Sequence, residues 1–174
     1  MSTYVANTAH RLTARTSRAA HQRFVLLAAE FNPAITRALI RGAIDTLRHH
    51  GVSQRQIRLL WVPGAFELPV VAARIATTRP RPDAIIALGA LIRGATPQYE
   101  VIAHAVAQGL SQVSVNARIP VTFGLIVATT LAQARARAGL PRRRRGGDKV
   151  DHTVNRGAEA ALAALAVLRL FETV

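Results

Sequence analysis

The stretch that decides the fold is RFVLLAAEF, residues 23–31, followed directly by NPAITRALIRGAIDTLRHHG, residues 32–51. The first part is a continuous apolar run of strand length. The second part opens with Asn32 and Pro33, which favour the start of a helix, and stops at Gly51, which favours its end. Its apolar residues recur on one helical face: Ile35, Leu39, Ala43, Ile44 and Leu47. The pattern predicts a buried strand that leads into an amphipathic helix.

The same alternation continues along the chain. Further apolar strands are predicted over 57–62, 84–92 and 120–128, and helices over 66–79, 98–115, 130–139 and 155–174. Each strand consists almost wholly of Val, Ile, Leu and Ala, which indicates a parallel sheet buried on both faces. Four strands joined by right-handed crossovers predict a three-layer α/β/α sandwich around a four-stranded parallel sheet.

The length of 174 residues predicts one domain with a core of its own. The chain contains no cysteine, which excludes disulfides, thiolate metal sites and cysteine nucleophiles. No apolar run approaches the roughly 20 residues that a membrane-spanning helix needs. We therefore expect a soluble protein of the cytoplasm, without a membrane partner.

The formal net charge of +14 is large enough to attract phosphates or nucleic acid. Lys149 is the only lysine, so nearly all of this charge is arginine, and a GC-rich coding sequence would produce that bias without any binding function. Two segments are conspicuously basic and irregular: a flexible arm predicted over 1–22, and a loop predicted over 140–154 that contains four successive arginines. A domain over 23–174 carries this loop as an insertion. We favour a solvated charge run over binding of RNA or another polyanion.

Chemistry is expected where the parallel strands end, because ligands bind there in open α/β sheets. The strand ends bring together Phe31, Phe66, the lone carboxylate of Glu67 and a Gly-Ala-Thr turn over 94–96. A planar heterocycle could stack on a phenylalanine, and an anion could bind the backbone N–H groups where the next helix starts. The sequence has no phosphate-binding P-loop, no dinucleotide motif, no serine elbow and no histidine pair at metal spacing.

Five segments together resemble the lumazine synthase family of riboflavin biosynthesis: WVPGAFELP (61–69), DAIIALGALIRGATPQYE (83–100), PVTFGLIVATT (120–130), QARARAG (133–139) and NRGAEAALAAL (155–165). The resemblance covers about residues 23–172. It implies a flavodoxin-like fold and the condensation of 5-amino-6-(D-ribitylamino)uracil with 3,4-dihydroxy-2-butanone 4-phosphate to 6,7-dimethyl-8-ribityllumazine. It implies neither a metal nor an organic cofactor.

The resemblance also implies roles for individual residues. Phe31 should stack on the pyrimidine, and Arg137 should pair with the phosphate through its planar guanidinium fork. Phe123 should reach the heterocycle from a neighbouring subunit. The other matching positions hold the uracil and ribityl chain (Ala65, Phe66 and Glu67), line the heterocycle (Ala90, Leu91 and Ile92), cradle the phosphate (Ala95 and Thr96) or supply a positive charge where many relatives have lysine (Arg156).

One position departs from the family pattern. Gln98 stands where the family has the histidine assigned as the proton carrier, and an amide does not titrate near neutral pH. An active enzyme could rely on positioning of the reactants, with the departing phosphate or a water carrying the proton. Alternatively, the chain could bind a lumazine or flavin without making one. A third possibility, an oligomer that binds RNA or another polyanion, rests on the charge alone.

The resemblance implies an assembly as well. Family members form pentamers, and some stack twelve pentamers into a shell. Shell-forming members have a short connection between the last two helices, whereas this chain has its arginine-rich loop there. We therefore predict a pentamer or a decamer.

Overall fold

The computed structural model describes residues 21–140 and 155–173. Its strands are β1 (Phe24–Ala29), β2 (Ile57–Val62), β3 (Ala84–Ile92) and β4 (Val121–Ala128). Its helices are α2 (Pro33–His49), the short η2 (Gln54–Gln56), α3 (Leu68–Ala76), α4 (Gln98–Ala117), α5 (Leu131–Arg137) and α6 (Arg156–Phe171). None of the helices in this described part is long and apolar enough to cross a membrane. The predicted arm and loop lie, apart from residues 21, 22 and 140, outside the described residues.

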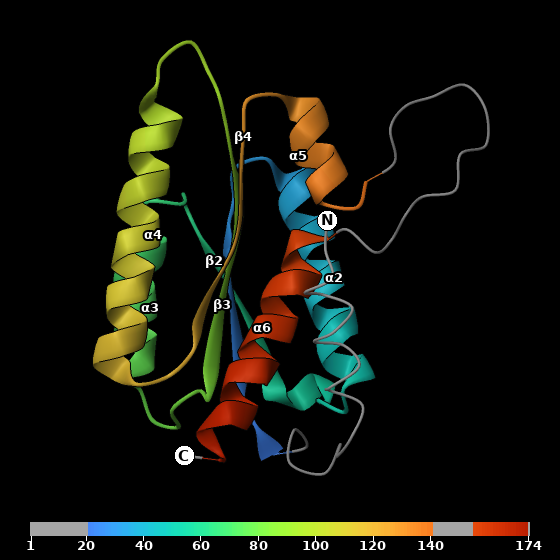
Figure 1. Ribbon diagram of the computed structural model, residues 1–174, viewed down its shortest axis with the longest axis vertical. Coiled ribbons are helices and arrows are strands. Elements are labelled where there is room, and N and C mark those ends of the chain that lie inside the picture. The colour runs from blue at the N-terminus through green and yellow to red at the C-terminus, as the bar shows by residue number, and fades with distance from the viewer. Residues whose placement is uncertain (1–20, 141–154, 174) are drawn as a thin grey trace, which may run out of the picture.

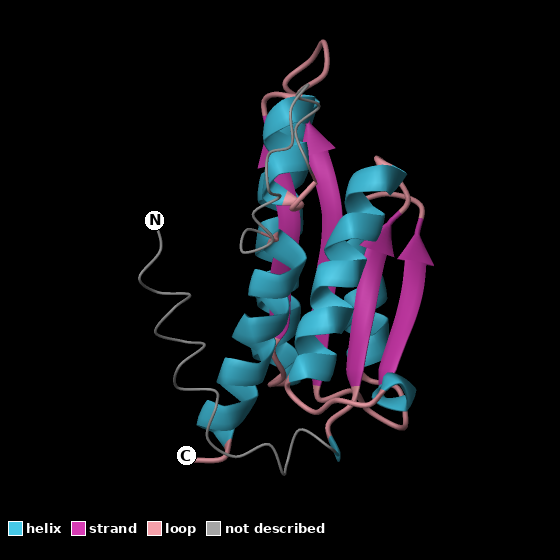
Figure 2. Cartoon of the chain, turned by 90° about the vertical axis from the view of Figure 1, so that its right-hand side faces the viewer, coloured by secondary structure: helices cyan, strands magenta, loops and turns pink. Residues whose placement is uncertain are grey.

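The four strands form one parallel sheet in the order β2-β1-β3-β4. Helices α3 and α4 cover one face of this sheet, while α2, α5 and α6 cover the other (Figure 1). Figure 2 looks onto the face covered by α2 and α6. The predicted three-layer sandwich is therefore confirmed, and the strand order is that of a flavodoxin-like sheet.

Each face of the sheet has its own apolar core. All six residues of β1 are buried, and they alternate between the two cores. Phe24, Leu26 and Ala28 pack with α2 and α6, whereas Val25, Leu27 and Ala29 pack with α3 and α4. This burial on both sides explains why the sequence of β1 is an uninterrupted apolar run.

The prediction that every strand is buried on both faces is wrong for β2. This strand lies at an edge of the sheet, where Leu59 is 37% exposed and Trp61 is 41% exposed. The opposite edge strand, β4, exposes Val127 to 44%. A single chain thus leaves apolar side chains uncovered at both edges of its sheet.

Asn155 fixes the start of α6 against its neighbours. Its Oδ1 accepts hydrogen bonds from the backbone N–H groups of Gly157 at 2.9 Å and Ala158 at 3.1 Å, which caps the helix. Its Nδ2 donates to the carbonyl of Ala38 in α2 at 3.1 Å and to that of Ala138 at 2.9 Å. One side chain therefore joins α2, α5 and α6 on the same face of the sheet.

Candidate active site

A cavity of about 430 Å³ opens at the carboxyl ends of β1, β2 and β3. In a sheet of this order the direction of winding reverses between β1 and β3, which is where such folds bind ligands. Nine of the residues singled out from the sequence line the cavity: Phe31, Ala65, Phe66, Glu67, Ala90, Leu91, Ile92, Thr96 and Gln98. The structure thus gathers residues from four separate segments into one place.

The turn after β1 displays the ring of Phe31 to solvent. The hydroxyl of buried Thr36 donates to the Phe31 carbonyl at 3.1 Å, and Asn32 donates through Nδ2 to the Ala90 carbonyl of β3 at 3.0 Å. Asn32 occupies the predicted N-cap position of α2 with a left-handed backbone of φ 54°, but its side chain makes no cap hydrogen bond. Its side chain instead ties β1 to β3, while the Phe31 ring remains 72% exposed. The anchored backbone leaves that aromatic face open to a planar ligand.

The turn after β2 contributes an aromatic ring and a carboxylate. Phe66 is 63% exposed, and the Glu67 carboxylate has no hydrogen bond or ion pair with any residue that the structure describes. A Cβ at position 64 would lie 2.8 Å from Glu67 Oε2, so Gly64 is what lets the carboxylate approach the turn. The carboxylate oxygens of Glu67 are therefore available to accept hydrogen bonds from a ligand.

The turn after β3 leads into the 20-residue helix α4. Thr96 and Gln98 line the cavity beside the first turn of this helix. The Glu100 N–H donates to the Pro97 carbonyl at 3.0 Å, and the backbone N–H groups ahead of it in the turn precede the helical hydrogen-bond pattern. Such a helix start favours an anion. Ala95 is exposed in the same turn but does not line the cavity. The Gln98 side chain has no partner among the described residues.

Tyr99 lines the same cavity, although no sequence pattern pointed to it. Its side chain is buried, and its hydroxyl donates to Glu100 Oε1 at 2.6 Å. The hydrogen bond to Glu100 raises the pKa of Tyr99 above 10.0, and burial and the negative charge of Glu100 act in the same direction, while Arg93 opposes them. The remaining lining residues are Ala29, Asn32, Gly64, Gly94 and Ile102.

The raised pKa of Tyr99 predicts a loss of folding stability in alkaline solution. Just above pH 10 the phenol stays protonated in the folded chain and ionises in the unfolded one, so the stability present below pH 10 declines as the pH rises through the folded-state pKa. The chain has two tyrosines, so Tyr4→Phe leaves Tyr99 alone in an ultraviolet titration of the phenolate. We expect a midpoint above 10.0 that moves down in Tyr4→Phe/Glu100→Gln. An equal midpoint in both proteins would contradict the pairing.

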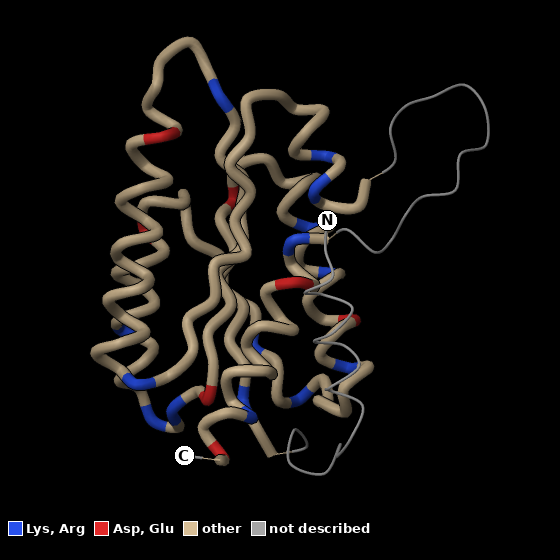
Figure 3. Tube along the Cα trace, in the orientation of Figure 1, with Lys and Arg blue, Asp and Glu red and all other residues tan. Residues whose placement is uncertain are grey.

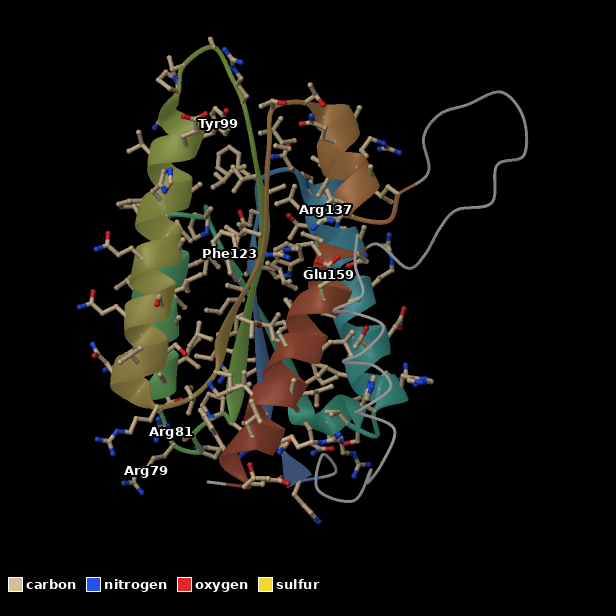
Figure 4. All side chains as sticks on the ribbon, in the orientation of Figure 1. Arg79, Arg81, Tyr99, Phe123, Arg137 and Glu159 are labelled. Carbon is tan, nitrogen blue, oxygen red and sulfur yellow. The ribbon has the colours of Figure 1, made fainter. Side chains whose placement is uncertain are left out.

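Phe123 does not line the cavity of its own chain. It lies in edge strand β4, opposite Ala87 of β3, and is partly buried against the core beneath α3 and α4. In Figure 4, Phe123 lies further down the sheet than Tyr99. Since β4 has no strand beyond it in the described chain, the side chain lies beside an open edge.

Arg137 and Arg156 lie on the other face of the sheet. Arg137 ends α5 and Arg156 begins α6, and both pair with Glu159 Oε2, through Nη2 at 3.4 Å and Nη1 at 3.0 Å respectively. Figure 4 labels Arg137 and Glu159 near each other. The predicted grouping of Arg137 with Thr96 around one phosphate is thus not formed within one chain. Glu159 was missed, although its position three residues after Arg156 on a helix was the available signal.

Comparison with known proteins identifies what this arrangement resembles. A family model described as 6,7-dimethyl-8-ribityllumazine synthase matches residues 21–172. A protein of that name from Gemmatimonas aurantiaca is 45% identical to the chain, over 87% of the chain and 85% of the relative. One from Prosthecochloris aestuarii is 44% identical, over 90% of the chain and 93% of the relative. One from Leuconostoc mesenteroides is 38% identical over 88% of the chain and 91% of the relative.

Proposed function

Because the chain belongs to the 6,7-dimethyl-8-ribityllumazine synthase family, a family of transferases in riboflavin biosynthesis, we propose that it catalyses the condensation of 5-amino-6-(D-ribitylamino)uracil with 3,4-dihydroxy-2-butanone 4-phosphate. The products are 6,7-dimethyl-8-ribityllumazine, phosphate and two molecules of water. One observation carries the proposal: an exposed phenylalanine and a carboxylate with no partner among the described residues border a single cavity beside the start of a helix. The cytoplasm stays the predicted compartment, on composition alone.

The pyrimidine is proposed to bind at the ends of β1 and β2. The Phe31 ring stacks on the heterocycle, and Glu67 accepts hydrogen bonds from ribityl hydroxyls. Ala65 and Phe66 border the same substrate, and the backbone of residues 90–92 supplies polar groups along its edge. These contacts orient the 5-amino group toward the phosphate end of the cavity. A well-oriented pair of reactants can lower the barrier by about 7 kcal/mol or more.

The butanone phosphate is proposed to bind where Thr96 and the start of α4 favour an anion. Ala95 contributes backbone to this turn. Arg137, with Arg156 beside it, is proposed to reach the phosphate from a neighbouring chain, because within its own chain it lies across the sheet. Phe123 at the open edge of β4 would approach the heterocycle in the same way. We therefore propose a site shared by two chains of a pentamer or decamer.

Gln98 leaves the proton transfers to other groups. Its amide can donate or accept a hydrogen bond and so hold the ketone, but it cannot carry a proton near neutral pH. We propose that the departing phosphate or a water takes that role. General acid and base catalysis is typically worth about 10²- to 10⁴-fold, so the enzyme is expected to be slow and not inactive.

The proposed reaction is tested by mixing the purified protein with both substrates and following the fluorescent lumazine. Product formed above the uncatalysed rate supports the synthase. Tight binding of a lumazine or flavin without product formation would instead support a binding protein on the same scaffold, the alternative that Gln98 raises. A heat-denatured sample gives the uncatalysed rate under identical conditions.

Replacing Gln98 with histidine is expected to raise turnover several-fold. The imidazole can exchange a proton near neutral pH, whereas the amide cannot, and Gln98 is an exposed residue on the cavity wall that has room for the ring. Affinity for the pyrimidine should stay nearly the same because Phe31 and Glu67 are untouched. Steady-state kinetics, with Gln98→Asn as an amide control, measures this. A histidine variant no faster than wild type would mean that the proton route lies elsewhere.

A further inference from the structure

A second cavity, of about 710 Å³, lies at the opposite end of the sheet from the candidate active site. Its lining comes from the residue before β1, from the connection between α3 and β3, and from the end of α4. Four arginines of the described part of the chain contribute to it: Arg23, Arg79, Arg81 and Arg118. Figure 3 shows the basic positions gathered at this lower end of the sheet, and Figure 4 labels Arg79 and Arg81 there.

The local structure holds this basic rim in place. A guanidinium nitrogen of Arg81 donates to the carbonyl of Ala117, which joins the α3–β3 connection to the end of α4. The hydroxyl of Thr78 donates to the carbonyl of Ile75 at 2.8 Å, which closes the last turn of α3. Arg79, Arg81 and Arg118 therefore lie beside two helix ends that are connected to each other, and Arg23 lies directly before β1.

The positive charge of the rim is not balanced by its surroundings. Arg23, Arg79, Arg81 and Arg118 form no ion pair with any residue in the described ranges. Asp83 is close, since it accepts a hydrogen bond from the backbone N–H of Arg23 at 2.6 Å. Four guanidinium groups outweigh this one carboxylate and two helix C-termini of about −0.5 charge each, which leaves a net charge of about +2. An anion with at least two charges would match that excess.

The side chains that line the cavity indicate which kind of anion it would bind. Guanidinium groups bind phosphate oxygens in bidentate geometry. Among the residues that the structure describes, the lining contains no aromatic side chain on which a base could stack, and its remaining polar groups are two threonines and Asn116. We propose that this cavity binds a chain of repeated phosphates, through its phosphates alone, as in the backbone of single-stranded RNA or in inorganic polyphosphate. This function is separate from the condensation proposed at the other end of the sheet.

The test measures binding of two probes to the full-length protein by fluorescence anisotropy, over a series of salt concentrations. One probe is a labelled oligouridylate, and the other is labelled inorganic polyphosphate. Arg79→Gln/Arg118→Gln removes two guanidinium groups from the rim. Arg37→Gln/Arg41→Gln, on the exposed side of α2, removes the same charge elsewhere and serves as the matched control.

We expect both probes to bind. The rim variant should weaken each about tenfold, and should lower the slope of log K against log salt for the oligouridylate by about 1.4, which is about 0.7 for each lost phosphate contact. The α2 control should change affinity less than about twofold.

Several outcomes would overturn the proposal. Equal weakening in the rim and α2 variants would mean that net charge alone attracts the probes. Binding that is lost on replacing Arg142 to Arg145 with glutamine, and is unchanged in the rim variant, would assign it to that arginine run. Binding of the oligouridylate without binding of polyphosphate would show recognition of sugar or base. Lumazine formation, measured on the same samples, should be unchanged in the rim variant, so failure of one proposal is distinguishable from failure of the other.

Discussion

Replacing Gly157 with alanine is expected to lower the free energy of unfolding by about 3 kcal/mol or more, toward the upper end of the cost of overpacking a core. Gly157 lies in the first turn of α6, and a Cβ there would overlap the backbone carbonyl of Leu39 in α2. A backbone group inside a helix cannot move aside as the end of a flexible side chain can. The two helices would have to separate, which would also strain the hydrogen bond from Asn155 to the Ala38 carbonyl.

Chemical denaturation measures this effect, and Gly94→Ala is its control. A Cβ at Gly94 would meet nothing within 4 Å, so the control reports what the change from glycine to alanine does without a clash. Helix propensity alone predicts the opposite sign at position 157, because alanine favours a helix over glycine by about 1 kcal/mol. A Gly157→Ala protein at least as stable as wild type would therefore show that α2 and α6 do not make this close contact.

The sequence predicted the layers of the fold because each element carries strong local signals. Pro33 begins α2 as expected, and Gly51 follows its end with a φ of 88°. The strand assignments agree to within a residue or two, since their apolar runs are bounded by turn residues. The helix predicted from residue 66 begins at Leu68, because Glu67 serves as the residue before its first turn.

The exposed edges of the sheet could not be predicted in this way. Leu59 and Trp61 in β2 belong to a largely apolar run that only Arg58 interrupts, yet β2 is uncovered at the sheet edge whereas β1 is covered on both faces. An apolar run shows that a side chain avoids water. It does not show whether a helix of the same chain or a surface of another chain covers it.

The residues of the candidate site that follow strand ends could be predicted from the sequence. The residues whose place depends on side-chain contacts could not. Phe31, Glu67 and Thr96 meet because carboxyl ends of parallel strands share one side of the sheet. Tyr99 was missed because its hydrogen bond to Glu100 joins adjacent helical residues, which do not normally face each other. Arg137 was identified by its motif, and a motif does not say on which side of the sheet its residue lies.

Two variants that are each nearly inactive alone are expected to regain catalytic activity when they are coexpressed. Phe31→Ala/Glu67→Ala removes stacking and a charged hydrogen-bond acceptor from the cavity, and Arg137→Ala removes a charged donor to the phosphate. Each should reduce kcat/KM by about 10²-fold or more. Folding should tolerate Arg137→Ala, because a partly exposed ion pair such as Arg137 with Glu159 contributes about 1 kcal/mol or less.

In a mixed ring each site takes its cavity from one chain and its arginine from the next. With equal amounts of the two variants, about a quarter of the interfaces combine an intact cavity with an intact Arg137. Activity should therefore rise from about one hundredth to about a quarter of the wild-type value. Two different affinity tags allow the mixed oligomers to be isolated before the assay.

The matched control coexpresses Phe31→Ala with Glu67→Ala as two single variants. Both substitutions lie in the same cavity, which each site takes from a single chain. Every site therefore carries one of the two substitutions, and kcat/KM should remain the mean of the values of the two single variants. Mixed oligomers of the first pair that stay as slow as their parents would contradict a shared site. In that case Arg137 would have to act within its own chain, which the position of α5 on the opposite face of the sheet from α4 does not allow without a rearrangement of the helices.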